Sequence, residues 1–221
     1  MTYLQDYGLD SPVRALALLV LSADDTGMGK MMDILHIQKV IRYFEYIAGK
    51  DEIDYSNYKM GGVSYELAEN LETLVESGFI EKAGNCFTLS EMGKAAAEEL
   101  SDTIPRGTMD SLSFAKRRLN HLTGDELMFF MYNVVPETRA NSTEYPRLEK
   151  RRKRLIEGLI LKGAIITDEE KRMFGLTDEE YETLAITQDQ EFMDSIKKGC
   201  SDISAGRVKP LSELLAKHGL D

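Results

Sequence analysis

The chain has little of what usually marks a metal site, a redox centre or a membrane anchor. Its 221 residues contain two cysteines, Cys86 and Cys200, which lie outside any C-x-x-C spacing. We therefore predict neither a zinc site nor a redox pair, and expect both thiols to be reduced. The longest apolar run covers residues 15–21, whereas a membrane helix needs about 20 residues. Because the first ten residues hold two aspartates and no cation, which does not fit a signal peptide, we expect a soluble, cytoplasmic protein without a membrane partner.

Sequence motifs of enzymes are also missing. The chain contains neither G-x-S-x-G nor H-E-x-x-H. Residues 27–30 (GMGK) end like a phosphate-binding loop, but Asp24 and Met31 stand where that motif has its first glycine and its Ser or Thr. The three histidines are widely separated along the chain: His36, His121 and His218. We predict a protein that is not an enzyme and that binds no metal and no cofactor, the alternative being an enzyme whose site is assembled from scattered carboxylates.

Negative charge is unevenly distributed along the chain, whose formal net charge is −11. Residues 1–104 hold 8 Lys and Arg against 18 Asp and Glu, and residues 105–221 hold 19 against 20. Such an asymmetry indicates two units with different surfaces. Pro105 and Gly107 lie where the charge balance changes, in a segment typical of a linker. We therefore predict two domains, residues 1–104 and residues 105–221.

The first half has the sequence order of a winged helix-turn-helix. Capping residues followed by apolar residues at helical spacing predict helices over residues 11–23, 33–48, 64–77 and 90–100. Gly78 ends the third of these helices, and two short apolar runs around a turn in residues 79–89 predict a β-hairpin. Residues 51–62 are predicted to be irregular. Within the second helix, four polar residues fall outside the apolar positions: Gln38, Lys39, Arg42 and Glu45.

The second half is predicted to be entirely helical, so the predicted fold class is mainly α with one small β-hairpin as a wing. Capping-box patterns begin at Thr123, Thr167 and Thr177. We expect helices after each of these residues, and further helices over residues 109–121, 146–162 and 210–218. Residues 199–207 are predicted to form a loop.

Three segments of the first half carry a family resemblance: residues 35–43 (LHIQKVIRY), 58–67 (YKMGGVSYEL) and 87–93 (FTLSEMG). They resemble, in turn, the leucine-glutamine-lysine helix, the step into the third helix and the exit from the wing of the YwgA-like and phage-associated antitoxin-type (Panacea) winged-helix families. Val63 stands where these families usually have proline. The resemblance covers residues 12–100 and implies a regulator or an antitoxin.

The third predicted helix has an acidic polar face. No Lys or Arg occurs between residues 64 and 77, and the polar face carries Glu66, Glu69, Asn70 and Glu76, with Glu72 at its flank. In a winged helix this helix usually enters the major groove of DNA. Glutamates repel phosphates, whose neutralisation supplies much of the affinity for DNA. We therefore predict that this face is either solvated or a docking surface for a basic protein partner.

A basic stripe is predicted on the helix over residues 146–162. Its four cations follow the spacing i, i+3, i+4 and i+7, which places them on one helix face: Arg147, Lys150, Arg151 and Arg154. Residues 116–118 (KRR) form a smaller basic cluster that would extend the stripe. The stripe is predicted to bind nucleic acid or an acidic partner, the alternative being a solvated face.

Our leading hypothesis is a non-enzymatic winged-helix regulator or antitoxin-like adaptor that contacts DNA or an acidic partner through the basic stripe. The alternative is a protein-interaction module that docks through the acidic third helix and binds no DNA. Because the two surfaces are complementary in charge, a third hypothesis is that they dock on each other, within one chain or in a homodimer.

Overall fold

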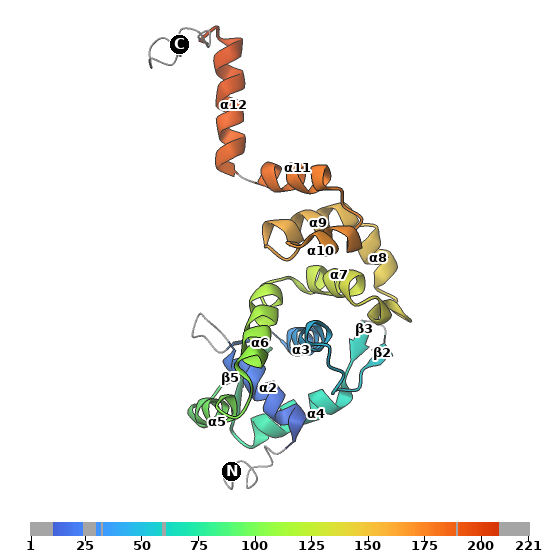
Figure 1. Ribbon diagram of the computed structural model, residues 1–221, viewed down its shortest axis with the longest axis vertical. Coiled ribbons are helices and arrows are strands. Elements are labelled where there is room, and N and C mark those ends of the chain that lie inside the picture. The colour runs from blue at the N-terminus through green and yellow to red at the C-terminus, as the bar shows by residue number, and fades with distance from the viewer. Residues whose placement is uncertain (1–10, 24–29, 32, 59–60, 189, 208–221) are drawn as a thin grey trace. The chain divides into compact units, whose positions relative to one another are not determined.

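Helices dominate the computed structural model, which describes residues 11–23, 30–31, 33–58, 61–188 and 190–207 (Figure 1). The predicted fold class, mainly α with a small β-hairpin, is confirmed. The predicted helix over residues 210–218 lies outside the described residues.

The first half follows the element order of a winged helix. Its helices are α2 (Pro12–Ser22), α3 (Ile34–Ala48), α4 (Tyr65–Glu76) and α5 (Glu91–Ser101). Three strands form an antiparallel sheet in the order β1-β5-β4: β1 (Lys30–Met31), β4 (Ile80–Ala83) and β5 (Cys86–Leu89). The hairpin of β4 and β5 is the one predicted after Gly78, whose φ of 78° lets the chain turn sharply out of α4. The hairpin contacts α4 and is a wing-like element beside it.

The prediction that residues 51–62 are irregular holds for residues 51–55 and is wrong from Ser56 onward. Two short strands in this stretch, β2 (Ser56–Tyr58) and β3 (Gly61–Val63), pair in an antiparallel hairpin. Gly61 has a φ of 85°, and a Cβ there would lie 2.9 Å from a ring carbon of Tyr132. The second hairpin therefore packs closely against the helices of the second half, which the sequence pattern did not indicate.

The second half is helical, as predicted, but its helix boundaries differ. It contains α6 (Arg106–Leu119), α7 (Gly124–Val134), the 3-10 helix η1 (Pro136–Arg139), α8 (Tyr145–Glu149), α9 (Arg152–Leu161), α10 (Asp168–Met173), α11 (Asp178–Gln188) and α12 (Gln190–Ser204). The capping boxes predicted at Thr123 and Thr167 are present. The single helix predicted over residues 146–162 is two helices, with the break at Lys150 and Arg151. The loop predicted over residues 199–207 is wrong up to Ser204, because α12 continues through it.

The predicted domain boundary between residues 104 and 105 does not separate two compact units. The compact units are Met1–Gly175 and Leu176–Asp221. Helix α6 packs along α3 and also contacts α2, and α7 contacts α3. Leu112 and Leu119 of α6 are fully buried in this packing. The helices that follow the proline-glycine linker thus complete the core of the first half instead of starting a core of their own.

Arg118 of α6 is the central polar link of the first unit. Its guanidinium donates to the Tyr43 hydroxyl at 2.8 Å, to the Ala164 carbonyl at 2.9 and 2.5 Å, and to the Glu170 carboxylate. The rings of Tyr43, Phe114 and Phe130 lie 5.3–5.8 Å from its carbon Cζ. Burial alone would raise the pKa of Glu170, but hydrogen bonds from Arg118 and from two backbone amides lower it below the ordinary value. The buried Arg118–Glu170 ion pair joins α6 to α10, and the hydrogen bond to Tyr43 joins α6 to α3.

We predict that Arg118→Met lowers the free energy of unfolding by about 3–5 kcal/mol, because it leaves the Glu170 carboxylate buried without its partner. Urea unfolding followed by circular dichroism measures the change. The exposed neighbouring change Arg117→Met is the matched control and is expected to cost less than about 1 kcal/mol. Equal unfolding midpoints for the two variants would contradict the role given to Arg118.

Two polar side chains of α3 hold the start of α4. Lys39 Nζ donates to the Gly62 carbonyl at 2.6 Å, and Gln38 Nε2 donates to the Ser64 carbonyl at 3.2 Å. Ser64 is the N-cap of α4, where its hydroxyl accepts from a backbone amide. The sequence places Gln38 and Lys39 outside the apolar positions of α3, yet both are buried. Their hydrogen bonds to backbone carbonyls explain how polar groups are accommodated there.

The buried position of Lys39 makes the stability of the folded protein depend on pH. Burial, reinforced by the charge of Arg42, lowers the pKa of Lys39 to about 8. Between that value and the ordinary lysine pKa of about 10.5, the unfolded chain holds more protons than the folded protein, so stability rises with pH. Between about pH 7.5 and 9.5, the free energy of unfolding should rise by about 2 kcal/mol because of this group.

Urea unfolding of the wild type and of Lys39→Met across this pH range tests the expectation. The difference in stability between wild type and K39M should shift in favour of the wild type as the pH rises. The exposed lysine change Lys150→Met serves as the control and should keep the wild-type pH dependence. A pH-independent difference between wild type and K39M would show that Lys39 is not the titrating group.

Candidate functional site

The exposed side of α4 carries the acidic face that the sequence predicts. Glu66, Glu69, Glu72 and Glu76 are all exposed. Within the described part of the chain, none of these four carboxylates has an ion-pair partner. The apolar side of α4 is buried through Leu67, Leu71 and Leu74, which fixes the acidic side outward.

Asn70 is engaged in a structural contact instead of being free for a partner. Its Oδ1 accepts from Arg14 Nε at 2.7 Å, and its Nδ2 donates to the Glu66 carbonyl at 2.8 Å. Arg14 belongs to α2, so this pair ties α4 to the neighbouring helix. Of the four residues predicted as a docking surface, the three glutamates therefore remain available, whereas both ends of the Asn70 amide are already used.

A groove of about 200 Å³ adjoins the acidic face. Its lining comes from three parts of the fold and is mainly apolar: Ile34, Ala68, Leu71, Glu72, Val75, Glu76, Lys82 and Phe87. Ile34 opens α3 and is 40% exposed, and Phe87 lies in the wing-like hairpin. Glu72 and Glu76 belong to both the groove and the acidic face. We name the groove together with Glu66, Glu69, Glu72 and Glu76 the α4 surface.

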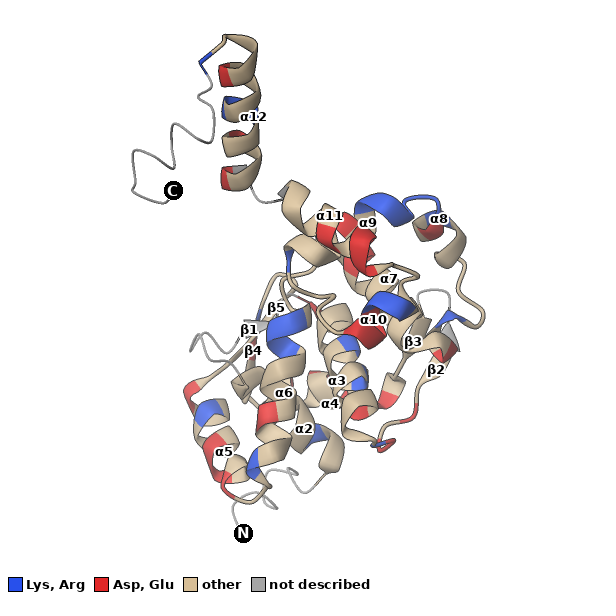
Figure 2. Cartoon of the chain, turned by 45° about the horizontal axis from the view of Figure 1, so that its top comes forward, with Lys and Arg blue, Asp and Glu red and all other residues tan. Residues whose placement is uncertain are grey.

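The predicted basic stripe is divided by the break between α8 and α9, where Lys and Arg gather (Figure 2). Arg147 donates to both carboxylate oxygens of Asp125, at 3.1 and 2.6 Å, and to Glu144 at 2.7 Å. Arg151 donates to the same Asp125 carboxylate. Hydrogen bonds from Arg147 lower the pKa of Asp125, and Asp125 in turn raises the pKa of Arg147. Two of the four predicted cations are thus already paired within the chain.

Three other cations of this region are exposed and, among the described residues, have no ion-pair partner: Lys150, Lys153 and Arg154. Arg152 instead donates to the Phe174 carbonyl. The prediction that residues 116–118 extend the stripe is wrong, because Lys116 and Arg118 are buried. Lys116 Nζ donates to the Leu21 carbonyl at 2.7 Å, a contact that anchors α6 on α2. The exposed basic patch therefore consists of Lys150, Lys153 and Arg154.

The described histidines and cysteines do not assemble into a site. His36 is buried, with Nδ1 2.7 Å from the Asp33 carboxylate and Nε2 2.8 Å from the Leu122 carbonyl. His121 Nε2 lies 3.0 Å from the Lys162 carbonyl, and His218 lies outside the described residues. Cys86 and Cys200 are free thiols. Over the described ranges, no three His, Cys, Asp or Glu side chains are grouped closely enough to hold a metal ion.

Comparison with known proteins finds no match for this chain. No protein-family model, no curated protein and no solved structure matches the chain. The resemblance to the YwgA-like and Panacea families therefore stays a prediction. Among the described residues, no helix combines the length and the apolar character that crossing a bilayer requires.

Proposed function

We propose that the protein is a non-catalytic winged-helix adaptor whose α4 surface binds a basic segment of a partner protein. The observation that carries this proposal is the exposed row of glutamates on α4, which have no ion-pair partner among the described residues; α4 is in the place of the helix that reads DNA in winged helices. A polyanion would be repelled by this row, whereas a cationic peptide would be attracted and steered to it.

The groove beside the row supports a protein partner over a small cation. Apolar side chains in a desolvated pocket supply most of the binding energy at protein interfaces, and charges on the rim supply orientation and association rate. Leu71 and Phe87 offer the apolar floor, and Glu72 and Glu76 the acidic rim. The surface therefore suits a basic segment that carries at least one apolar anchor.

A short synthetic peptide with leucines at helical spacing and lysines at the other positions tests this function. Fluorescence anisotropy measures its affinity for the protein. Neutralising three glutamates of the α4 surface in the variant E69Q/E72Q/E76Q should weaken its binding about tenfold, because three exposed ion pairs are worth about 0.5 kcal/mol each. The matched control E91Q/E98Q/E99Q removes the same charge from α5 and should bind like the wild type. Equal weakening by both variants would mean that net charge, not the α4 surface, attracts the peptide.

A second candidate function is contact with nucleic acid or an acidic partner through Lys150, Lys153 and Arg154, as in a regulator or an antitoxin-like protein. The observation in its favour is that these three exposed cations have no ion-pair partner in the described part of the chain. Exposed cations of this kind bind phosphates by releasing counterions, which makes the affinity depend strongly on salt.

We predict for this second function that K150Q/K153Q/R154Q lowers the slope of log affinity against log salt by about 3 on random duplex DNA, since each lost phosphate contact removes about 0.9. Asp125→Asn should do the opposite and strengthen binding, because it frees Arg151 from its carboxylate partner and leaves Arg147 paired with Glu144 alone. Gel shifts over a salt series measure both effects. The variant K50Q/K94Q/R106Q is the charge-matched control, and absence of binding by the wild type at low salt would end this proposal.

A further inference from the structure

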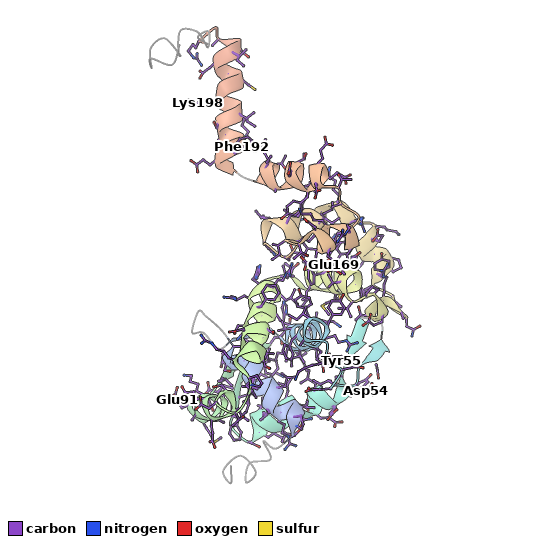
Figure 3. All side chains as sticks on the ribbon, in the orientation of Figure 1. Asp54, Tyr55, Glu91, Glu169, Phe192 and Lys198 are labelled. Atoms are coloured by element: carbon purple, nitrogen blue, oxygen red, sulfur yellow. The ribbon has the colours of Figure 1, made fainter. Side chains whose placement is uncertain are left out.

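A polar pocket lies beside α3, in the segment that leads from this helix into β2. Its volume is about 390 Å³, and its lining consists of Arg42 and the residues 51–55: Asp51, Glu52, Ile53, Asp54 and Tyr55. Figure 3 labels Asp54 and Tyr55, which come immediately before β2. The pocket belongs to the first compact unit and shares no residue with the α4 surface or the exposed basic patch.

Buried polar atoms without a hydrogen-bond partner gather around this pocket. Among the described residues, four buried side-chain nitrogen or oxygen atoms lack such a partner, and three of them lie here: Arg42 Nε, Glu45 Oε2 and the Tyr55 hydroxyl oxygen. Buried polar groups in proteins are nearly always hydrogen-bonded, so each exception needs a physical explanation. Three exceptions at one pocket indicate an imbalance that a bound polar molecule would offset.

Glu45 is fully buried against the lining of the pocket. Its Oε1 accepts from the backbone amides of Glu52 and Ile53 at 2.8 and 2.9 Å, and its Oε2 lies 3.9 Å from Arg42 Nη1. Burial raises the pKa of the Glu45 carboxyl, and these amides and Arg42 offset the rise only in part. Burial also raises the pKa of Tyr55, and the charge of Glu45 raises it further. The Glu45 carboxylate is therefore a buried charge that the chain compensates incompletely.

Carboxylates outnumber cations around the pocket. Among the described residues there are five of the former and three of the latter: Glu45, Asp51, Glu52, Asp54 and Glu137 against Lys39, Arg42 and Lys50. The Arg42 guanidinium is shared, because it donates to Asp51 at 3.0 Å and to Glu137 at 3.3 Å. Asp54 is exposed and has no ion-pair partner in the part of the chain that the structure describes. This formal excess of two negative charges favours a cationic ligand.

The geometry favours an organic cation with several N–H donors over a metal ion. Over the described ranges, no three His, Cys, Asp or Glu side chains are grouped closely enough to hold a metal ion. The carboxylates of this pocket are therefore too widely spaced to coordinate a bare ion. A guanidinium is planar and carries five N–H donors, so it can reach carboxylates on different sides of a pocket at once.

We propose that this pocket binds a guanidinium group, with Asp51 and Asp54 as its acceptors and the buried charge of Glu45 attracting it from behind the lining. The inference goes beyond the proposed function, because it involves no residue of the α4 surface. A small guanidinium compound and an arginine side chain of a protein partner share this chemistry, and the experiments below distinguish them.

Methylguanidinium is the first probe, titrated into the full chain at millimolar concentration and followed by the backbone amide signals in NMR spectra. Saturable shifts are expected for residues 50–55. Tetramethylammonium carries the same charge without an N–H donor and should cause no saturable shift. Equal saturation by both ions would overturn the proposal, because charge alone would then explain the binding, and so would the absence of saturation by methylguanidinium.

Two variants test the assigned residues. Glu45→Gln keeps an acceptor for the two amides but removes the buried charge, and it should weaken methylguanidinium binding about tenfold. Asp54→Asn removes an exposed charge and should weaken it about threefold. The matched control Asp110→Asn removes an exposed carboxylate from α6 and should bind like the wild type. Wild-type affinity of D54N would overturn the proposal even if urea unfolding shows that E45Q does not fold, and so would equal weakening by D54N and D110N.

The source of the guanidinium is tested with N-acetyl-arginine amide, which presents the same group on a peptide backbone. Binding at least as tight as that of methylguanidinium would support an arginine of a protein partner. Exclusion of this probe, while methylguanidinium binds, would support a small free compound. The variant E69Q/E72Q/E76Q should bind methylguanidinium like the wild type, so failure of this proposal and failure of the proposed function are distinguishable.

Discussion

The buried guanidinium of Arg118 is the constraint on which the first unit depends. A cation removed from water is tolerated only with hydrogen bonds and an opposite charge, and Arg118 obtains these from Tyr43, Ala164 and Glu170. These partners belong to α3, to the chain after α9 and to α10. This side chain thus connects the first half to the helices that follow, within the compact unit that ends at Gly175.

Local signals in the sequence predicted most helix starts correctly. Ser64, Thr123 and Thr167 cap helices as expected, because a capping hydroxyl acts on amides only three residues away. Burial of charged side chains could not be predicted in the same way. Lys39 and Arg118 look like surface residues in the sequence, and their partners are carbonyls, a hydroxyl and a carboxylate that only the tertiary fold brings near.

The two predicted surfaces differ in how far sequence alone could describe them. The acidic face of α4 follows from helical periodicity, since its glutamates and its buried leucines lie on one helix. The groove beside it could not be predicted, because Ile34 and Phe87 come from other elements. The prediction of the basic stripe assumed that residues 146–162 form one straight helix whose cations have no counter-ions in the chain. Neither the break at Lys150 nor the pairing of Arg147 with Asp125, 22 residues earlier, has a signal in the local pattern.

The distribution of cations favours one of the two proposed functions over the other. Lys39, Lys116 and Arg118 are buried, and Arg147 and Arg151 share one carboxylate, so these charges do little to offset the acidic surface. Among the described cations of α8, α9 and the break between them, Lys150, Lys153 and Arg154 are the exposed ones without an ion-pair partner that could meet a polyanion, whereas a basic protein segment would meet an attractive surface at α4. For this reason we place protein docking before nucleic-acid binding.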